Sequence, residues 1–262
     1  GMLLASGYAR LPHMIRSYEF LNLEGRKFST SRNWGINSDE ALEFFPADYW
    51  RYYLASILPE HSDSDFSLQE FQKAVNSDLN DTLGNLCHRC LTFAKNNYGG
   101  NAPQPLPEGE WSEGDQKFAQ AIRGTPDKVA ALMHEYKLQQ ALREAMELAR
   151  KANKAFNDGE PWKNVKGSDA GKAQAATTVY LCLNALHSLA IMLHPFTPAS
   201  CEKISKFLAC KGATEEGWKT AAEMAVAPGA KLNLENLAPV FTKIEDSQVQ
   251  ALREKLEART KK

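Results

Sequence analysis

The stretch ATTVYLCLNALHSLAIMLHP, residues 176–195, decides the fold of this chain. Its apolar residues recur at the three- and four-residue intervals of one helix face, and further apolar residues occupy the other faces. A helix that is apolar on every side must be covered by neighbours, so it is predicted to form the centre of a helix bundle, ended by Pro195 and Pro198. Polar side chains interrupt the run from Val179 to Leu193, which is shorter than the roughly 18 apolar residues of a membrane span. No transmembrane helix is therefore expected.

The flanking sequence is predominantly helical as well. Two further apolar stripes have helical spacing, the first made by Leu79, Leu83, Leu86, Cys90 and Phe93 and the second by Leu138, Leu142, Ala145, Ala149, Ala152 and Phe156. Thr125-Pro126 is expected to start the second of these helices and Gly159-Glu160-Pro161 to stop it. Short helices are expected at 199–210 and 215–225, then an extended tail and a charged last helix. One strand is predicted over Ile15–Leu21, so the fold class is mainly α.

The overall charge excludes one class of function. The chain has 31 lysines and arginines against 32 aspartates and glutamates, a formal charge of −1, which is unsuited to a histone-like DNA binder. The charge is polarised, because residues 1–36 carry +3 and residues 37–70 carry −7. The cysteines number five, an odd count, and lie in apolar helical patterns, which favours a reducing, cytoplasmic compartment.

A basic, hydroxyl-rich loop is the first candidate site. Gly25-Arg26-Lys27-Phe28-Ser29-Thr30-Ser31-Arg32-Asn33 places three cations and several small hydroxyl groups in a short segment after the predicted strand. Such groups can donate hydrogen bonds to phosphate oxygens and neutralise their charge. The same composition is also typical of a solvated surface turn.

Two further candidates lie on or near the predicted helices. Asn85 and Arg89 are four residues apart, so they share an exposed helix face, and an amide with a guanidinium can recognise unpaired nucleotides. Trp162 follows a helix-stopping proline and is a candidate platform for stacking a base. The alternatives are a polar helix face without a ligand and a tryptophan that closes the end of the bundle. Cys87 and Cys90 lack a second metal-binding pair, so no zinc site is predicted.

The order of these elements carries a family resemblance. Lys27-Phe28-Ser29-Thr30-Ser31 resembles the KMSKS signature of class I aminoacyl-tRNA synthetases. With the Asn85/Arg89 helix, Pro161-Trp162 and the Leu193-x-Pro195-Phe196-x-Pro198 segment, nearly the whole chain is similar to the carboxy-terminal half of the methionyl-tRNA synthetases. The resemblance implies an anticodon-binding helix bundle preceded by a short remnant of a Rossmann-type catalytic domain.

The resemblance also implies roles for particular residues. Asn85, Arg89 and Trp162 match the positions that bind the CAU anticodon of a methionine-accepting tRNA. Lys27, Ser29 and Ser31 match the catalytic loop that stabilises the phosphates of ATP, taken with Mg²⁺ in the intact enzyme, and Lys27 and Arg32 would contact the nucleotide. Thr30 stands where the signature has its second lysine, so ATP activation is expected to be weaker or to use a neighbouring arginine.

The expected organisation has four parts: the end of the catalytic domain (1–36), an acidic connecting helical segment (37–66), the anticodon-binding bundle (67–227) and a linking tail with a helix (228–262). The HIGH motif, the methionine pocket and the zinc-bearing insertion of the family have no counterpart. The chain is therefore expected not to aminoacylate by itself, to require no cofactor, and to have tRNA and the catalytic domain absent from this chain as partners, with no membrane or DNA. A helical protein-interaction module and another class I synthetase are the alternatives.

Overall fold

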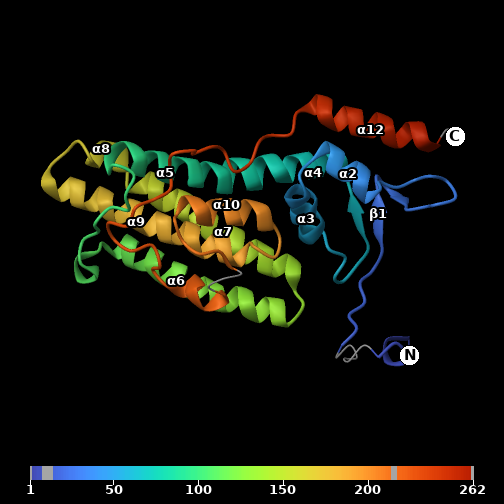
Figure 1. Ribbon diagram of the computed structural model, residues 1–262, viewed down its shortest axis with the longest axis horizontal. Helices are drawn as coiled ribbons and strands as arrows, with labels where there is room; N and C mark the ends of the chain where they lie inside the picture. The colour runs from blue at the N-terminus through green and yellow to red at the C-terminus, as the bar shows by residue number, and fades with distance from the viewer. Residues whose placement is uncertain (1, 8–13, 214–216, 261–262) are drawn as a thin grey trace.

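A computed structural model describes residues 2–7, 14–213 and 217–260 of the chain. The molecule is elongated, with a helix bundle at one end and a small sheet at the other (Figure 1). One long helical rod, formed by α4 (Leu68–Ala74), the π-helical η1 (Val75–Gly84) and α5 (Asn85–Asn97), runs between the two ends. This rod connects the region of the basic loop to the region of Trp162.

The bundle is built around α9 (Asp169–Met192), as the sequence predicts. Every residue from Ala175 to Met192 is buried, because the helix is surrounded by α5, α6 (Glu113–His134), α7 (Leu138–Asp158) and α10 (Pro198–Phe207). Among the described residues, α9 is long and apolar enough to cross a membrane, but its most apolar window is entirely buried inside the protein. The helix ends before Pro195, and α10 (Pro198–Phe207) follows.

The α6–α7 hairpin forms one side of the bundle and corrects the predicted helix start. Helix α6 (Glu113–His134) contains Pro126 in its interior, and α7 (Leu138–Asp158) begins after a short turn. Thr125-Pro126 is therefore not a start signal. The helix that carries the predicted stripe, α7, starts at Leu138. The helix that contains Thr125-Pro126, α6, starts after Ser112, whose hydroxyl accepts a hydrogen bond from the backbone N–H of Asp115 in a capping box. The prediction of the stop was right, since α7 ends at Asp158.

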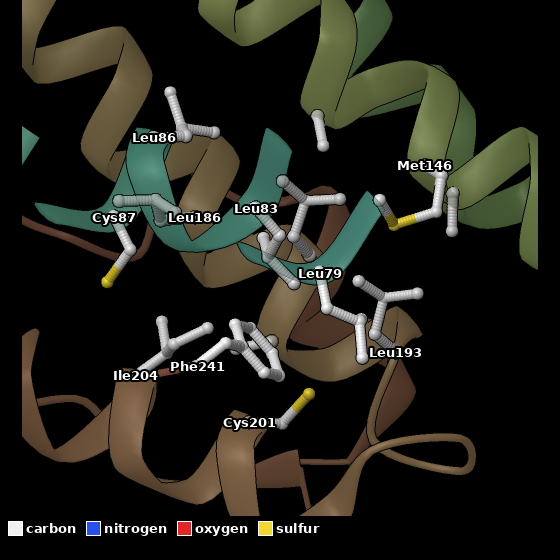
Figure 2. Close-up of a cluster of buried hydrophobic side chains, with 14 of the residues drawn as sticks. Leu79, Leu83, Leu86, Cys87, Met146, Leu186, Leu193, Cys201, Ile204 and Phe241 are labelled. Carbon is white, nitrogen blue, oxygen red and sulfur yellow. The ribbon is translucent and has the colours of Figure 1, made fainter. Parts of the chain in front are cut away.

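The stripe of the rod that faces the core is close to the predicted one. Leu79, Leu83, Leu86 and Cys90 are buried, whereas Phe93 is half-buried. Figure 2 shows the leucines of this stripe meeting Met146 of α7, Leu186 of α9 and Phe241 of the tail. The π-helical conformation of η1 was not predicted, because a spacing of three and four residues does not distinguish a π-helix from an α-helix.

A three-stranded sheet lies at the other end of the molecule, and it corrects the predicted strand. Residues 15–20 are exposed and form no strand, while β1 spans Leu21–Leu23. It pairs with β2 (Arg26–Lys27) in antiparallel fashion and with β3 (Ser64–Phe66) in parallel fashion. The alternation over residues 15–20 is therefore not a sign of pairing, because the apolar side chains there face solvent, and of the predicted strand Leu21 alone belongs to β1.

Helices and aromatic rings fill the space between the sheet and the bundle. Helices α2 (Ser38–Phe44) and α3 (Ala47–Ser56) lie beside the sheet, and the Trp50 ring stacks on Phe66 and Phe71 at centroid distances of 5.7 and 4.6 Å. These rings make the acidic segment part of a buried core.

The tail returns along the rod and ends in a helix beside the sheet (Figure 1). The described part of the segment predicted as a helix at 215–225 is a 3₁₀ turn, η3 (Trp218–Ala222); residues 214–216 lie outside the described residues. Extended backbone then leads to α12 (Asp246–Thr260), the predicted charged last helix. The remaining short elements are α1 (Met2–Ala5), η2 (Glu108–Glu110) and α8 (Pro161–Asn164).

Candidate nucleic-acid interface

A polar pocket opens where the C-terminal end of α7 packs beside the rod. Its volume is about 440 Å³. It is lined by polar and charged side chains, namely Asp81, Thr82, Asn85, Arg89, Arg150, Asn153, Lys154, Asn157 and Asp158. We call this the polar pocket. Two of the three residues predicted to bind RNA, Asn85 and Arg89, lie in its wall on α5.

Arg89 is held in position by contacts with the end of α7. Its Nη2 donates a hydrogen bond of 2.8 Å to Oδ1 of Asn157. Its guanidinium carbon lies 4.7 Å from the ring centroid of Phe156 and 5.7 Å from that of Trp162. The aromatic faces and the amide fix the plane of the guanidinium while leaving other N–H groups for a ligand.

Trp162 is brought to the same place by a turn with special backbone geometry. Glu160 adopts a left-handed conformation with φ of 38°, and Pro161 then begins α8. Asn164 Nδ2 donates to the carbonyl of Gly159 at 2.8 Å, which closes the turn. The indole packs on Phe156 at 6.0 Å and remains 38% exposed, so one of its surfaces is available for stacking.

The chemistry of the polar pocket suits an unpaired nucleotide. Asn85 is exposed and offers both an amide donor and a carbonyl acceptor, and Arg89 offers donors in a fixed plane. The two cations of α7 that line the polar pocket each lie near a carboxylate, because Lys154 pairs with Asp158 at 2.6 Å and Arg150 lies 3.7 Å from Asp78. Base edges can therefore be recognised by hydrogen bonds, and the ring face by stacking on a tryptophan.

Several residues of the polar pocket were missed by the sequence reasoning. Arg150, Asn153 and Asn157 follow one another at intervals of three and four residues on the polar side of α7. That spacing is a visible signal, but nothing in the sequence alone shows that this side faces α5. Asn153 also donates to the Thr82 carbonyl at 2.9 Å, which fixes α7 to the π-helical turn.

The basic loop lies at the opposite end of the molecule, beyond β2 (Figure 1). Backbone hydrogen bonds in both directions between Ser29 and Trp34, each 2.9 Å, close the loop, and the Oγ atoms of Ser29 and Ser31 are 3.3 Å apart. The Lys27 ammonium lies 5.3 Å from the ring centroid of Phe20. Within the described residues, neither Lys27 nor Arg32 has a carboxylate within ion-pair distance. Both cations are exposed, as binding a phosphate group requires.

The Cys87–Cys90 pair is unsuited to a metal. Both side chains are buried, and burial raises the pKa of the Cys87 thiol to about 12. A metal-binding cysteine must lose its proton, which this environment opposes. No cluster of three or more potential metal ligands occurs in the part of the chain that the structure describes.

Together, the bundle around a buried central helix and the polar pocket flanked by a half-exposed tryptophan have the architecture of the anticodon-binding domain of a class I aminoacyl-tRNA synthetase. The family model of the anticodon-binding domain of methionyl-tRNA ligase matches residues 106–261, and that of class I tRNA synthetases (M) matches residues 1–91. The chain belongs to the methionyl-tRNA ligase family.

Individual relatives agree with this assignment. The chain is 44% identical to the methionine–tRNA ligase of Pyrococcus furiosus over 198 residues, which is 76% of this chain and 26% of that protein. It is 38% identical to the ligase of Thermofilum pendens over 258 residues, which is 98% of this chain and 44% of that protein. The chain thus spans less than half the length of these relatives.

Solved structures show the same fold. The apo methionyl-tRNA synthetase of Mycobacterium tuberculosis matches with a TM-score of 0.78 and 26% identity, covering 93% of this chain and 46% of that one. Its complex with methionyl-adenylate matches with a TM-score of 0.79 and 28% identity, covering 92% and 46%. The membership in the methionyl family argues against the alternative of another class I synthetase.

Proposed function

We propose that this chain binds the anticodon loop of a methionine-accepting tRNA in the polar pocket, with Trp162 stacking one unpaired base. The observation that carries the proposal is the position of Arg89, 5.7 Å from the ring centroid of the half-exposed Trp162 and bonded to Asn157. A nucleotide can reach both groups at once. In this arrangement Asn85 and Arg89 contact base edges and Trp162 contacts a ring face.

The acidic segment supports the same placement of the RNA. Residues 37–70 carry a net charge of −7, while residues 143–172, which include most of α7, carry seven bases against five acids. Phosphates are repelled by the first segment and weakly attracted by the second. The RNA therefore approaches the bundle at the end that bears Arg89 and Lys154.

We further propose that the whole enzyme attaches methionine to this tRNA at the expense of ATP and that the basic loop serves the ATP-dependent step. Lys27, Ser29, Ser31 and Arg32 would contact the ATP phosphates, with Mg²⁺ as the accompanying ion. The exposure of Lys27 and Arg32 supports this role. By itself the chain would bind tRNA without aminoacylating it, in keeping with its covering 44% of the length of the Thermofilum pendens ligase. The division of the chain into four parts, 1–36, 37–66, 67–227 and 228–262, is part of this proposal.

A binding experiment with RNA hairpins tests the proposal. A hairpin carrying the CAU anticodon is compared with the same hairpin carrying another triplet, using the wild-type chain and the Asn85→Ala and Arg89→Lys variants. Wild type should prefer the CAU hairpin at least about tenfold, and each variant should lose much of that preference, since one good base contact is worth roughly 1–3 kcal/mol. Equal binding of both hairpins by wild type would instead favour the protein-interaction module.

A further inference from the structure

A second cavity lies on the other flank of α7, next to the polar pocket. It has a volume of about 680 Å³ and is bounded by α6, α7, α9 and the turn before α8. Its wall includes the apolar side chains of Phe118, Ala121 and Ala155. We call this the α6–α7 cavity. Its size falls within the range of pockets that hold small organic ligands, roughly 300–1,000 Å³.

The α6–α7 cavity and the polar pocket share part of their walls. Lys154 and Asp158, which pair at 2.6 Å, line both. The two spaces are therefore separated by one exposed ion pair on the last turns of α7. This ion pair forms a ridge between the two spaces. When the bases of an RNA strand occupy the polar pocket, the next nucleotide can reach this ridge.

The lining of the α6–α7 cavity carries three lysines against two aspartates, Asp115 and Asp158, and this net charge of +1 favours a phosphate-bearing ligand. Three lysines line the cavity, and two of them have carboxylate partners: Lys117 with Glu113, and Lys154 with Asp158. Within the described residues, no carboxylate lies within ion-pair distance of the third, Lys151, which is exposed. The exposed ammonium can contact a phosphate, and the apolar wall of the same cavity can pack against a base, so one nucleotide can make both contacts.

We propose that the α6–α7 cavity receives the base of an unpaired nucleotide that flanks the anticodon triplet, with Lys151 contacting its phosphate. The inference rests on the proposed function, because it requires the triplet to occupy the polar pocket. It adds a fourth nucleotide to the recognised sequence. It also gives α7 a role as a ridge that separates the flanking base from the triplet.

The test uses hairpins with the CAU triplet in which the base on its 5′ side, or the base on its 3′ side, is replaced by an abasic residue. One of the two abasic hairpins should bind the wild-type chain about fivefold more weakly or worse. In the Ala121→Phe variant, which fills the α6–α7 cavity, the same abasic substitution should have no further effect. Equal losses in wild type and in the variant would overturn the proposal, as would the absence of a loss in wild type.

A second pair of variants does not depend on filling the cavity. Lys151→Ala should reduce the slope of log affinity against log salt concentration by about 0.7, the value for one phosphate contact of a single strand. Arg143→Ala is the matched control, because Arg143 is also exposed on α7 and no carboxylate among the described residues lies within ion-pair distance of it. If the two variants changed the salt slope equally, Lys151 would act only as one of several positive charges on α7, and its proposed phosphate contact would be overturned.

Failure of the proposed function gives a different result. If the wild-type chain does not distinguish the CAU hairpin from other triplets, the polar pocket is not an anticodon site and both proposals fall. If it does distinguish them while the abasic hairpins bind as the intact one does, only the α6–α7 cavity proposal falls.

Discussion

Trp162 and Arg89 bring an aromatic ring and a guanidinium group together at one end of the helix bundle. Trp162 is separated from Arg89 by 73 positions in the sequence, yet its ring centroid lies 5.7 Å from the guanidinium carbon of Arg89. Phe156 lies against both, at 4.7 Å from the guanidinium and 6.0 Å from the indole. The phenylalanine thus supports the two groups while taking no exposed position itself.

Truncation of Trp162 is expected to weaken RNA binding without unfolding the protein. Trp162→Ala should reduce affinity for the CAU hairpin by about 1–3 kcal/mol, the usual value of stacking one base. Fluorescence anisotropy titrations measure the change. Tyr18→Ala is the control, since Tyr18 is 37% exposed, against 38% for Trp162, and lies three residues before β1, which Figure 1 shows at the other end of the molecule. A similar loss in both variants would contradict the stacking role.

Buried thiols provide a residue-scale test of the core. Burial raises the pKa of Cys87 and of Cys201 to about 12, so at pH 8 both remain protonated in the folded state. A thiol reagent acts on the thiolate, and these two cysteines should therefore react only after unfolding. Cys210 is partly exposed and should react first. Rapid labelling of Cys87 or Cys201 in the native protein, followed by peptide mapping, would argue against the packing.

At the scale of elements, helix boundaries show what the sequence can and cannot specify. Gly159-Glu160-Pro161 ends α7 as predicted, because a left-handed residue followed by proline cannot continue the helix. Thr125-Pro126 has the composition of a start but lies inside α6. There the Thr125 hydroxyl donates to the Ala121 carbonyl one turn earlier. The Trp218 indole donates to the Pro126 carbonyl, so a contact distant in sequence also supports this part of the helix.

Gly159 is expected to be irreplaceable at the end of α7. A Cβ at this position would lie 2.6 Å from Oγ1 and 2.8 Å from Cγ2 of Thr178 on α9. Gly159→Ala should therefore lower the free energy of unfolding by about 1–3 kcal/mol. Urea denaturation measures this value, and the change should shrink markedly in a Thr178→Ala background. An equal loss in both backgrounds would refute the steric explanation.

The return of the tail depends on hydrogen bonds to the rod. Asn76 accepts from the Ile244 backbone N–H at 2.8 Å and donates to the Ile244 carbonyl at 3.0 Å. Asn76→Ala leaves the buried Ile244 N–H unpaired, while the Ile244 carbonyl keeps its 3.1 Å hydrogen bond from Gln72 Nε2. The variant should cost about 1–3 kcal/mol of stability in urea denaturation. Asn80→Ala is the control from the same turns, where the side chain bonds only to Asp81 among the described contacts, and should change stability by less than about 0.5 kcal/mol. Equal stabilities of the two variants would contradict the tethering role.

At the scale of the whole molecule, the rod and the returning tail couple two distant ends. Arg259 of α12 lies 2.6 Å from Glu40 and Lys255 lies 3.1 Å from Glu43, so the basic tail neutralises part of the acidic segment. The sequence predicted the central helix, the rod and the last helix because their spacing reflects burial. It could not predict the sheet partners or the contacts of α7, since these depend on pairings between distant segments.

The candidate site was predictable only in part for the same reason. Asn85, Arg89 and Trp162 could be selected by local chemistry and by resemblance. Their association with Asn157 and Phe156 required the three-dimensional arrangement of α5 and α7. The α6–α7 cavity likewise has no local signature, because its wall comes from three long helices and one turn.

One end of this elongated molecule is proposed to read a methionine anticodon. The most direct measurement is equilibrium binding of the chain to an intact methionine-accepting tRNA and to the same tRNA with its anticodon changed, at near-physiological salt. We expect tight binding that falls at least about tenfold when the anticodon is changed, and that is also weakened in Trp162→Ala. Equal, weak binding of both tRNAs by the wild-type chain would contradict the claim.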